Sequence, residues 1–316
     1  MLNKKYLQEL ISVTRQHIKL SEAVIEKDYY VTQAIHALSG IENEYFRLVF
    51  SGGTCLAKAH KIVKRMSEDV DFKIQFKNTT RNYRKSFILK ELKEFRSLIT
   101  SKLVIPGLTI GQPIARNEGQ YLRIDVNYPS AFLMSARLRP HVLLEFTLSD
   151  IRLSAENLPI KTLIEETLNN TVIFTPASTL CISVDETAIE KWVSLTRKII
   201  AIERTYHPDD KTLIRHVYDL NAIKHADRIN AAFFTLANVI VRNNAKQFKN
   251  QHPEYSTDPV TEIKQSLALL KNKALWQERY QEFIEEMVYD EASAQEYENA
   301  IQTLESISER VIEALN

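Results

Sequence analysis

The sequence predicts an α+β fold, in which helices come first, a mixed sheet forms the core, and a long helical region follows. Strand-type patterns are confined to about residues 45–155. Helical periodicity governs residues 7–38 and dominates from Glu186 to the end of the chain. No internal repeat or flexible linker interrupts this order. We therefore expect an N-terminal part, residues 1–157, made of helices plus the sheet core, and a helical part, residues 158–316.

The composition is that of a globular protein without a strong charge bias. The chain has 316 residues, of which 44% are hydrophobic and 26% charged, and its formal net charge is +1. This charge argues against a basic coat for nucleic acid over the whole surface. Two cysteines, Cys55 and Cys181, are too few for a disulfide framework and suit a reducing cytoplasm, although a single bridge stays open.

Nothing in the sequence predicts a membrane segment. The N-terminus lacks the apolar core of a signal peptide. The best apolar run, residues 233–241, is interrupted by polar residues and is far too short to span a bilayer. We therefore expect a cytoplasmic protein without a membrane-bound part.

The core begins with a strand that ends at a turn of small residues. Residues 47–50 form a short buried-type strand, Gly52-Gly53 interrupts it, and residues 54–64 follow with helical spacing. The chain has only six glycines, so two adjacent ones are notable. Glycine lets the backbone approach a ligand closely, although an ordinary tight turn would also use it.

The next strand carries two acids. Residues 70–76 alternate between apolar and polar side chains, which is typical of a half-buried strand. Because alternate residues share a face, Asp69 and Asp71 point the same way, opposite to Val70 and Phe72. Two carboxylates on one face can hold divalent metal over phosphates that the preceding turn binds.

A third acid on a neighbouring strand would complete such a site. Residues 87–103 are expected to form a helix, and residues 121–128 and 141–147 two further strands. Each of these strands contains one candidate acid. Glu145 has apolar neighbours on both sides and is costly to bury unless it is paired or binds metal, so it is favoured. Asp125 is the alternative, and it could instead form a salt bridge with Arg123, which lies on its own face.

Motifs of other enzyme classes are absent. The sequence has no P-loop, no G-x-G-x-x-G, no H-E-x-x-H and no paired C-x-x-C motif. Its eight histidines are scattered without metal-ligand spacing. These absences disfavour a zinc enzyme, a Rossmann dehydrogenase and a kinase.

Ordered motifs along most of the chain resemble those of one known family. In order, they are Glu26-Lys27-Asp28-Tyr29, Gly52-Gly53-Thr54-x-Leu56-x-Lys58, Arg65-x-Ser67-Glu68-Asp69-x-Asp71-Phe72, Tyr128-Pro129-Ser130 with Arg139 to Phe146, Glu190-Lys191-Trp192, and Arg215 to Leu220. Together they resemble the AbiEii/AbiGii nucleotidyltransferase toxins, within the DNA polymerase β-like nucleotidyltransferase superfamily. At residues 190–192 the order of the aromatic residue and the Glu-Lys pair departs from the family pattern.

The resemblance implies a polymerase β-like core with a cleft that the helical part closes. Asp69 and Asp71 would bind Mg²⁺ or Mn²⁺, with Glu145 as the third carboxylate that orients the acceptor hydroxyl. Lys191 would neutralise phosphate charge, and Asp219 would fix Lys191 or contact the nucleotide. The residues implied in nucleotide binding are Ser51, Gly52, Gly53, Thr54, Arg65, Ser67, Lys191 and Arg215.

Simpler roles stay open for several of these residues. Arg65 and Ser67 could equally support the start of the acid strand. Arg215 and Asp219, four residues apart on one helix face, could pair with each other and have no contact with the nucleotide. Other charged and aromatic residues are expected to be structural. Glu26, Lys27 and Asp28 are interpreted as bracing, Trp192 and Tyr218 as core, and Lys58, Lys61 and Lys64 as a solvated helix face.

The resemblance also implies a function. The protein would transfer a nucleoside monophosphate from an NTP to an acceptor, as the toxin of a toxin–antitoxin or abortive-infection pair with a cognate antitoxin. In some relatives the acceptor is tRNA, and the basic excess over residues 77–96 could track an RNA backbone or be a charged surface. The alternatives are a nucleotide- or RNA-binding module with little activity, and a transferase that modifies a protein or a small molecule.

Overall fold

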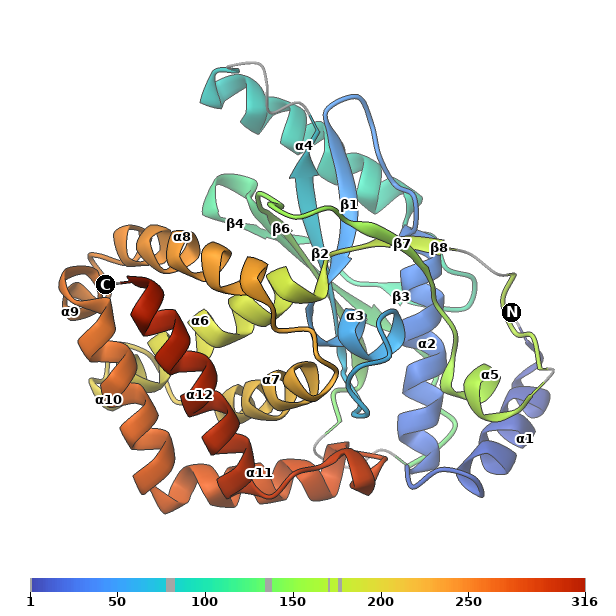
Figure 1. Cartoon of the computed structure of the whole chain (residues 1–316). Helices are drawn as coiled ribbons and strands as arrows, with labels where there is room; N and C mark the ends of the chain where they lie inside the picture. Colours follow the sequence, from blue (N-terminus) through green and yellow to red (C-terminus); the bar gives the residue numbers. More distant parts are fainter. Residues whose placement is uncertain (1, 78–82, 134–137, 170, 176–177, 316) are drawn as a thin grey trace. The chain divides into compact units, whose positions relative to one another are not determined.

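The chain folds into two compact units in the computed structural model, which describes residues 2–77, 83–133, 138–169, 171–175 and 178–315 (Figure 1). The first unit comprises Met1–Lys61 and Met66–Ser183. The second unit comprises Ile62–Arg65 and Val184–Asn316. The short segment Ile62–Arg65, which lies in the sequence between two stretches of the first unit, therefore belongs to the second unit.

A mixed sheet forms the centre of the first unit. Its strands are β1 Phe46–Ser51, β2 Asp69–Phe76, β3 Thr109–Ile110, β4 Ile114–Arg116, β5 Tyr121–Asn127, β6 His141–Leu148, β7 Glu156–Pro159 and β8 Ser178–Cys181. They lie in the order β3-β5-β6-β2-β1-β8-β7, with β4 paired to β5. The pairs β1–β2 and β5–β6 are antiparallel, whereas β2–β6 and β1–β8 are parallel. The predicted α+β class with a mixed sheet is confirmed.

The two faces of this sheet differ in chemistry. On one face, Phe72 of β2 lies between Phe50 of β1 and Phe146 of β6, with ring centroids 5.4 and 5.9 Å apart. Alternation along β2 places Asp69 and Asp71 on the opposite face, as the sequence predicts. We call this second face the acidic face.

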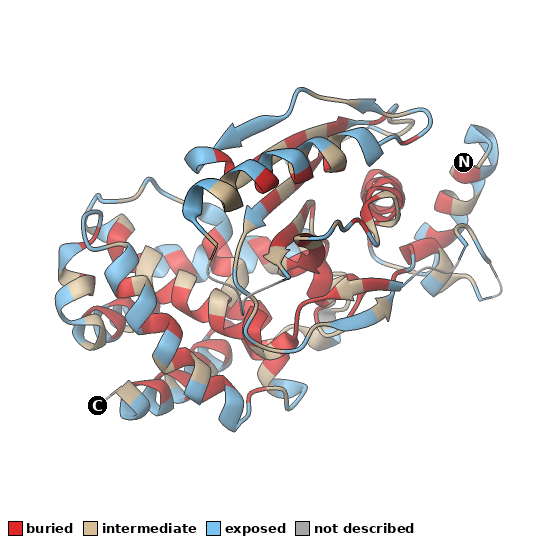
Figure 2. Cartoon of the chain, turned by 90° about the horizontal axis from the view of Figure 1, so that it is seen from above, coloured by how far each residue is buried: buried red, intermediate tan, exposed pale blue. Residues whose placement is uncertain are grey.

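Helices cover the apolar face of the sheet. The helices of the first unit are α1 Lys4–Arg15, α2 Glu22–Leu38, α3 Gly52–Lys58, α4 Lys85–Lys102 and α5 Leu163–Thr167. Helix α4 packs Phe95 against Phe46 of β1, with ring centroids 5.5 Å apart, on the apolar face. Helix α2 begins after Ser21, whose side chain accepts a hydrogen bond from Val24, and is buried along most of its length (Figure 2).

Helix α3 is shorter than the sequence predicts. The helical spacing extends over residues 54–64, but the helix ends at Lys58. Lys61 has a φ of +59°, which no α-helix accommodates. Beyond this residue, Ile62–Arg65 belongs to the second unit. Lys61 and Lys64 therefore do not lie on the helix face on which they were predicted.

The second unit is helical. Its helices are α6 Val184–Glu203, α7 Arg215–His225, α8 Ala231–Gln247, α9 Pro253–Thr257, α10 Pro259–Asn272, α11 Ala274–Met287 and α12 Tyr297–Leu315. They alternate between buried and exposed stripes, which is the pattern of amphipathic helices around one core (Figure 2). Trp192 and Tyr218 are both buried, as predicted, and the Trp192 indole donates a 2.9 Å hydrogen bond to Ser308.

Three elements beyond residue 157 belong to the first unit. They are β7, α5 and β8, although the strand signals of the sequence fade after about Leu158. Strand β8 pairs with β1, with Cys181 opposite Phe50. Cys181 and Cys55 of α3 are both buried, free thiols, so the single bridge that the sequence allowed is not formed. Burial raises the pKa of the Cys55 thiol, and the neighbouring Cys181 raises it further.

Among the described residues, none of the helices combines the length and the apolar character that crossing a membrane requires.

Candidate active site

The turn after β1 lies directly against an acid of β2. Gly52 has a φ of +77°, a conformation that favours glycine. A Cβ at this position would fall 2.1 Å from Oδ2 of Asp71 and 2.9 Å from its Cγ. Any larger residue would therefore have to displace the carboxylate. The glycine that the sequence singled out is required both by its backbone conformation and by its contact with Asp71.

Two hydroxyl groups tie this turn to the acid strand. The Ser51 hydroxyl donates a 3.2 Å hydrogen bond to the main-chain carbonyl of Asp71. The Thr54 hydroxyl donates a hydrogen bond to the main-chain carbonyl of Asp69. The side chains of both acids are left for other partners, because only main-chain oxygens accept these bonds. Both hydroxyls thus fix the turn relative to β2.

Three of the predicted carboxylates share the acidic face. In the register of the sheet, Asp71 lies between Ser51 of β1 and Glu145 of β6. Asp69 is two residues earlier on the same strand, so its side chain projects from the same face. All three acids are only partly buried, which keeps them accessible to a ligand.

Asp69 and Glu145 are engaged by neighbouring side chains. The guanidinium of Arg139 donates a hydrogen bond to Oδ1 of Asp69, and the Tyr121 hydroxyl donates one to Oε1 of Glu145. Burial raises the pKa of Tyr121, and its bond to Glu145 raises it further. Within the described residues, no three His, Cys, Asp or Glu side chains converge closely enough to hold a metal ion. The carboxylates share a face but keep these other partners.

Asp125 lies farther from the other acids. It faces Leu143 in the register of β5 and β6, and Leu143 in turn faces Asp69. Its carboxylate pairs with Arg123 at 2.9 Å, which is the salt bridge that the sequence allowed. The hydrogen bond from Arg123 is the main reason that the pKa of Asp125 is lowered. Glu145 is thus the direct neighbour of Asp71 in the sheet, whereas Asp125 is salt-bridged to Arg123.

A second charged cluster lies in the second unit. Asp219 of α7 accepts hydrogen bonds of 2.7 and 2.8 Å from the Arg65 guanidinium and pairs with Lys191 of α6 at 2.8 Å. The side chain of Asp219 is 0% exposed, that of Arg65 3% and that of Lys191 8%. Burial alone would raise the pKa of Asp219, but the two cations lower it below its ordinary value. We call these three residues the buried charge cluster.

His216 lies beside this cluster, and two predicted residues of the site, Arg215 and Ser67, lie at the start of α7 and just before β2. Burial lowers the pKa of His216 well below its usual range, and the charge of Lys191 lowers it further, so the ring stays neutral. Arg215 is half-buried at the first position of α7, and Ser67 is half-buried two residues before β2.

The residues expected to brace the core do so. Glu26 of α2 accepts hydrogen bonds from the Ser130 hydroxyl at 2.7 Å and from the main-chain N–H of Ala131 at 2.9 Å. Asp28 pairs with Lys58 at 2.6 Å. Lys58 is only 6% exposed, so its prediction as part of a solvated helix face is wrong.

Two residues at the acidic face were not recognised from the sequence. Tyr121 was assigned only to a strand, and Arg139 only to a motif, yet they contact Glu145 and Asp69. Their positions in the sequence could have indicated these contacts. Tyr121 lies two residues from Arg123, which faces Glu145 directly, and Arg139 lies just before β6.

The basic segment over residues 77–96 belongs to the other side of the sheet. Helix α4 packs on the apolar face through Phe95, away from the acidic face. Lys85 pairs with Glu118 at 2.6 Å, and the guanidinium of Arg96 lies where a Cβ on Gly119 would fall. Arg81 lies outside the described residues. Some cations of this segment are therefore already paired, and its helix does not lie on the acidic face.

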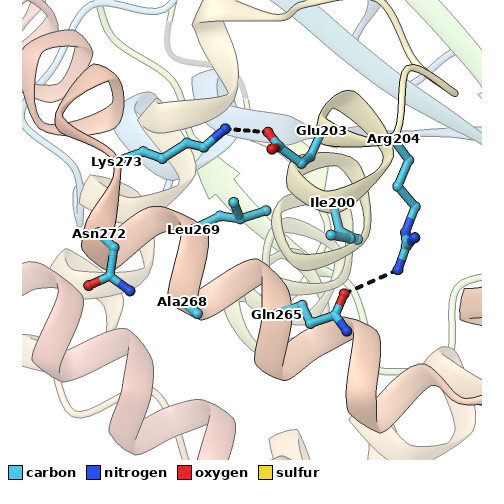
Figure 3. A pocket seen from close by; sticks show the side chains of 8 residues that line it. All are labelled: Ile200, Glu203, Arg204, Gln265, Ala268, Leu269, Asn272 and Lys273. Atoms are coloured by element: carbon cyan, nitrogen blue, oxygen red, sulfur yellow. Dashed lines mark hydrogen bonds and ion pairs between the residues drawn. The ribbon is translucent and has the colours of Figure 1, made fainter.

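The helical unit also contains a pocket of about 600 Å³ between the end of α6 and α10 (Figure 3). Its floor is apolar, and two polar contacts cross it, Lys273 with Glu203 at 2.5 Å and Arg204 with Gln265 at 3.1 Å. The pocket is lined by Ile200, Glu203, Arg204, Gln265, Ala268, Leu269, Asn272 and Lys273. None of the predicted site residues lines it.

The comparisons with known proteins agree with the motifs. The sequence profile of the nucleotidyl transferase AbiEii toxin family, of type IV toxin–antitoxin systems, matches residues 40–305. Among solved structures, MenT4, a nucleotidyltransferase toxin from Mycobacterium tuberculosis H37Rv, is 17% identical with a TM-score of 0.41, over 96% of this chain and 99% of that chain. No curated protein gives a significant match. Since the family profile matches most of the chain and includes both charged clusters, the protein belongs to the AbiEii family of nucleotidyl transferase toxins.

Proposed function

We propose that this nucleotidyltransferase toxin transfers a nucleoside monophosphate from an NTP to an RNA acceptor, such as tRNA, with Mg²⁺ or Mn²⁺ as cofactor. The observation that supports it best is the contact between the Gly52 turn and Asp71, beside Asp69 and Glu145 on one face of the sheet. A turn without side-chain bulk next to three carboxylates suits the transfer of a group that carries several phosphates.

The donor set suits a hard divalent cation. Asp69, Asp71 and Glu145 offer carboxylate oxygens, which Mg²⁺ and Mn²⁺ prefer over nitrogen or sulfur. When bound at these oxygens, such a cation would supply positive charge for the phosphates and would lower the pKa of the acceptor hydroxyl. Asp69 and Asp71 would hold it, and Glu145, directly beside Asp71, would orient the hydroxyl.

The turn would hold the triphosphate. Its backbone can approach phosphate oxygens closely because Gly52 and Gly53 have no side chains. The hydroxyls of Ser51 and Thr54 donate to main-chain carbonyls of β2 and so keep the turn in place. To bind a phosphate oxygen, either hydroxyl would have to turn its single O–H away from that carbonyl.

The buried charge cluster would supply positive charge from the helical unit. We propose that Lys191 neutralises phosphate charge, and that Asp219 holds its ammonium group, with Arg65 as the second partner of Asp219. A compact ammonium suits this role as a point charge. Arg65 precedes Asp69 by four residues, so the chain itself tethers this cluster to the acid strand. Ser67 and Arg215 are proposed to support the nucleotide, and the helical part to close over it.

An RNA acceptor is supported by cations on the acidic face rather than by helix α4. Arg116, Arg123 and Arg139 project from the acid-bearing side of the sheet or its edge, where they could contact phosphates near Glu145. We propose that the protein acts in the cytoplasm, where NTPs and tRNA are available, and that a cognate antitoxin counteracts it.

Incubation of the protein with total RNA, Mg²⁺ and each of four labelled NTPs tests the proposal. We expect label on tRNA-sized RNA with at least one NTP, and its loss in Asp69→Ala and Asp71→Ala. Measurable NTP binding without labelled RNA would move the search to protein or small-molecule acceptors. An absence of NTP binding would instead favour a binding module and contradict the proposed transfer.

A further inference from the structure

Arg139 contacts an acid that the proposed function assigns to the cation. Its guanidinium donates a hydrogen bond to Oδ1 of Asp69, and the two side chains are 44% and 29% exposed. The bond engages a carboxylate oxygen that a divalent cation would also need. One oxygen cannot face a guanidinium and a metal ion from the same side, because the two cations repel each other.

The backbone of Arg139 is fixed by a buried ion pair. Its main-chain N–H donates a 2.9 Å hydrogen bond to Glu68, and its carbonyl accepts one of 2.9 Å from Lys27. Lys27 and Glu68 also pair with each other, and their side chains are 0% and 7% exposed. Because both polar groups of the peptide are held by buried charges, the position of Arg139 is set by the fold rather than by chance contact at the surface.

The same helix holds the other end of the connection between β5 and β6. Glu26, which precedes Lys27 on α2, binds Ser130 and Ala131 just after β5. Adjacent residues of one buried helix thus fix both ends of this connection, and the second end delivers Arg139 to Asp69. The Glu-Lys-Asp-Tyr motif, which the transfer reaction does not use directly, has a structural purpose in this arrangement.

We infer that Arg139 is a positioning residue whose guanidinium takes the place of a divalent cation beside Asp69, so that cation binding must displace it. The inference rests on the proposed function in one respect, the binding of a cation at Asp69. Three carboxylates on one face repel one another unless positive charge lies near them. Arg139 supplies that charge before the cation binds, and it thereby competes with the cation.

The competition has a measurable size. If Asp69 is free of the Arg139 guanidinium in only a fraction of the molecules, the apparent affinity for the cation is reduced to that fraction of its intrinsic value. For a half-exposed ion pair, we expect removal of the guanidinium to strengthen cation binding about three- to tenfold. Removing Arg123, whose partner is Asp125 and not Asp69, should strengthen cation binding by less than about twofold, because only its general electrostatic repulsion of the cation is lost.

Mn²⁺ binding followed by the electron paramagnetic resonance signal of the free ion tests this inference without measuring activity. The variants are Arg139→Gln, with Arg139→Ala as a second form, and the matched control Arg123→Gln. The control removes the same charge from the same face, but its partner is Asp125. Asp69→Asn identifies the fraction of binding that depends on Asp69.

The expected result is tighter Asp69-dependent Mn²⁺ binding in both Arg139 variants and little change in the control. Equal affinity in wild type and the Arg139 variants, with binding still lost in Asp69→Asn, would overturn the inference and leave the proposed function intact. An equal gain in Arg123→Gln would also overturn it, because a general charge effect would then suffice. No saturable binding in any variant would overturn both.

Discussion

Replacing Asp219 by asparagine is expected to lower the free energy of unfolding of the second unit by about 3–5 kcal/mol at neutral pH. The carboxylate is fully buried and accepts bonds of 2.7 and 2.8 Å from Arg65 and pairs with Lys191 at 2.8 Å. Each such charge-assisted bond contributes about 1.5–3 kcal/mol net. Asparagine keeps the shape but removes the charge, so two buried cations would lie side by side without a counter-charge.

Urea unfolding followed by tryptophan fluorescence measures this loss. The chain has two tryptophans, Trp192 and Trp276, and both belong to the second unit, so the signal reports that unit. The matched control is Glu203→Gln, which removes an ion pair with Lys273 in which both side chains are 45% exposed. It should cost less than about 1 kcal/mol. An Asp219→Asn variant that loses no more than this control would refute the reasoning from burial.

The pH dependence gives a second check with a defined sign. The pKa of Asp219 is lower in the folded protein than its ordinary value of 3.8, because the two cations outweigh the effect of burial. The carboxylate therefore contributes its full stability above about pH 4, and this contribution is lost as the pH falls through the folded pKa. The difference between wild type and Asp219→Asn should be constant around neutrality and shrink only below about pH 4.

Three further predictions concern the first unit. In a transfer assay, Gly52→Ala should reduce nucleotidyl transfer about 100-fold or more, because its methyl group displaces Asp71. The control Gly40→Ala, at a φ of +71° with nothing within 4 Å, should cost only about 1–2 kcal/mol of stability in thermal unfolding. Glu145→Gln should lower kcat about 100-fold and Asp125→Asn less than about fivefold; the reverse order in steady-state kinetics would make Asp125 the third carboxylate. Lys27→Met should cost about 3–5 kcal/mol in urea unfolding, because it leaves Glu68 buried without its cation, and a neutral effect would contradict that account.

Local patterns were sufficient to predict the acid strand. The alternation over residues 70–76 is a property of consecutive residues, so it gave both the strand and the shared face of Asp69 and Asp71 before any tertiary contact was known. The same holds in part for the turn, because the positive φ of Gly52 is a local requirement, whereas its close approach to Asp71 is a tertiary contact. Features determined within a few residues are readable from the sequence.

Features that depend on distant partners were not readable. Lys58 was expected on a solvated helix face, and its burial is explained by distant partners, Asp28 thirty residues earlier and the main-chain carbonyl of Lys161. Helix α3 ends at Lys58, and the positive φ of Lys61, just before the chain enters the second unit at Ile62, is not visible in the helical spacing. Strand β8 has only four residues, which is too short for a clear alternation, and it is formed by pairing with β7 along its length and with β1 at Cys181.

Burial distinguishes the roles of the charged residues that the motifs bring together. The side chains of Glu68, Lys27 and Asp219 are 7%, 0% and 0% exposed, and each is satisfied by an opposite charge, so these residues hold neighbouring groups in place. Asp69 is 29% exposed on an open sheet face, and its partner Arg139 is 44% exposed, so this contact can be exchanged for another. A carboxylate that must take up and release a cation cannot be held as tightly as one that fixes the fold, since a buried ion pair is costly to break. We therefore propose that the partly exposed acids of β2 and β6 carry the chemistry, and that the buried Lys27–Glu68 pair, which binds the main chain of Arg139, fixes the structure beside them.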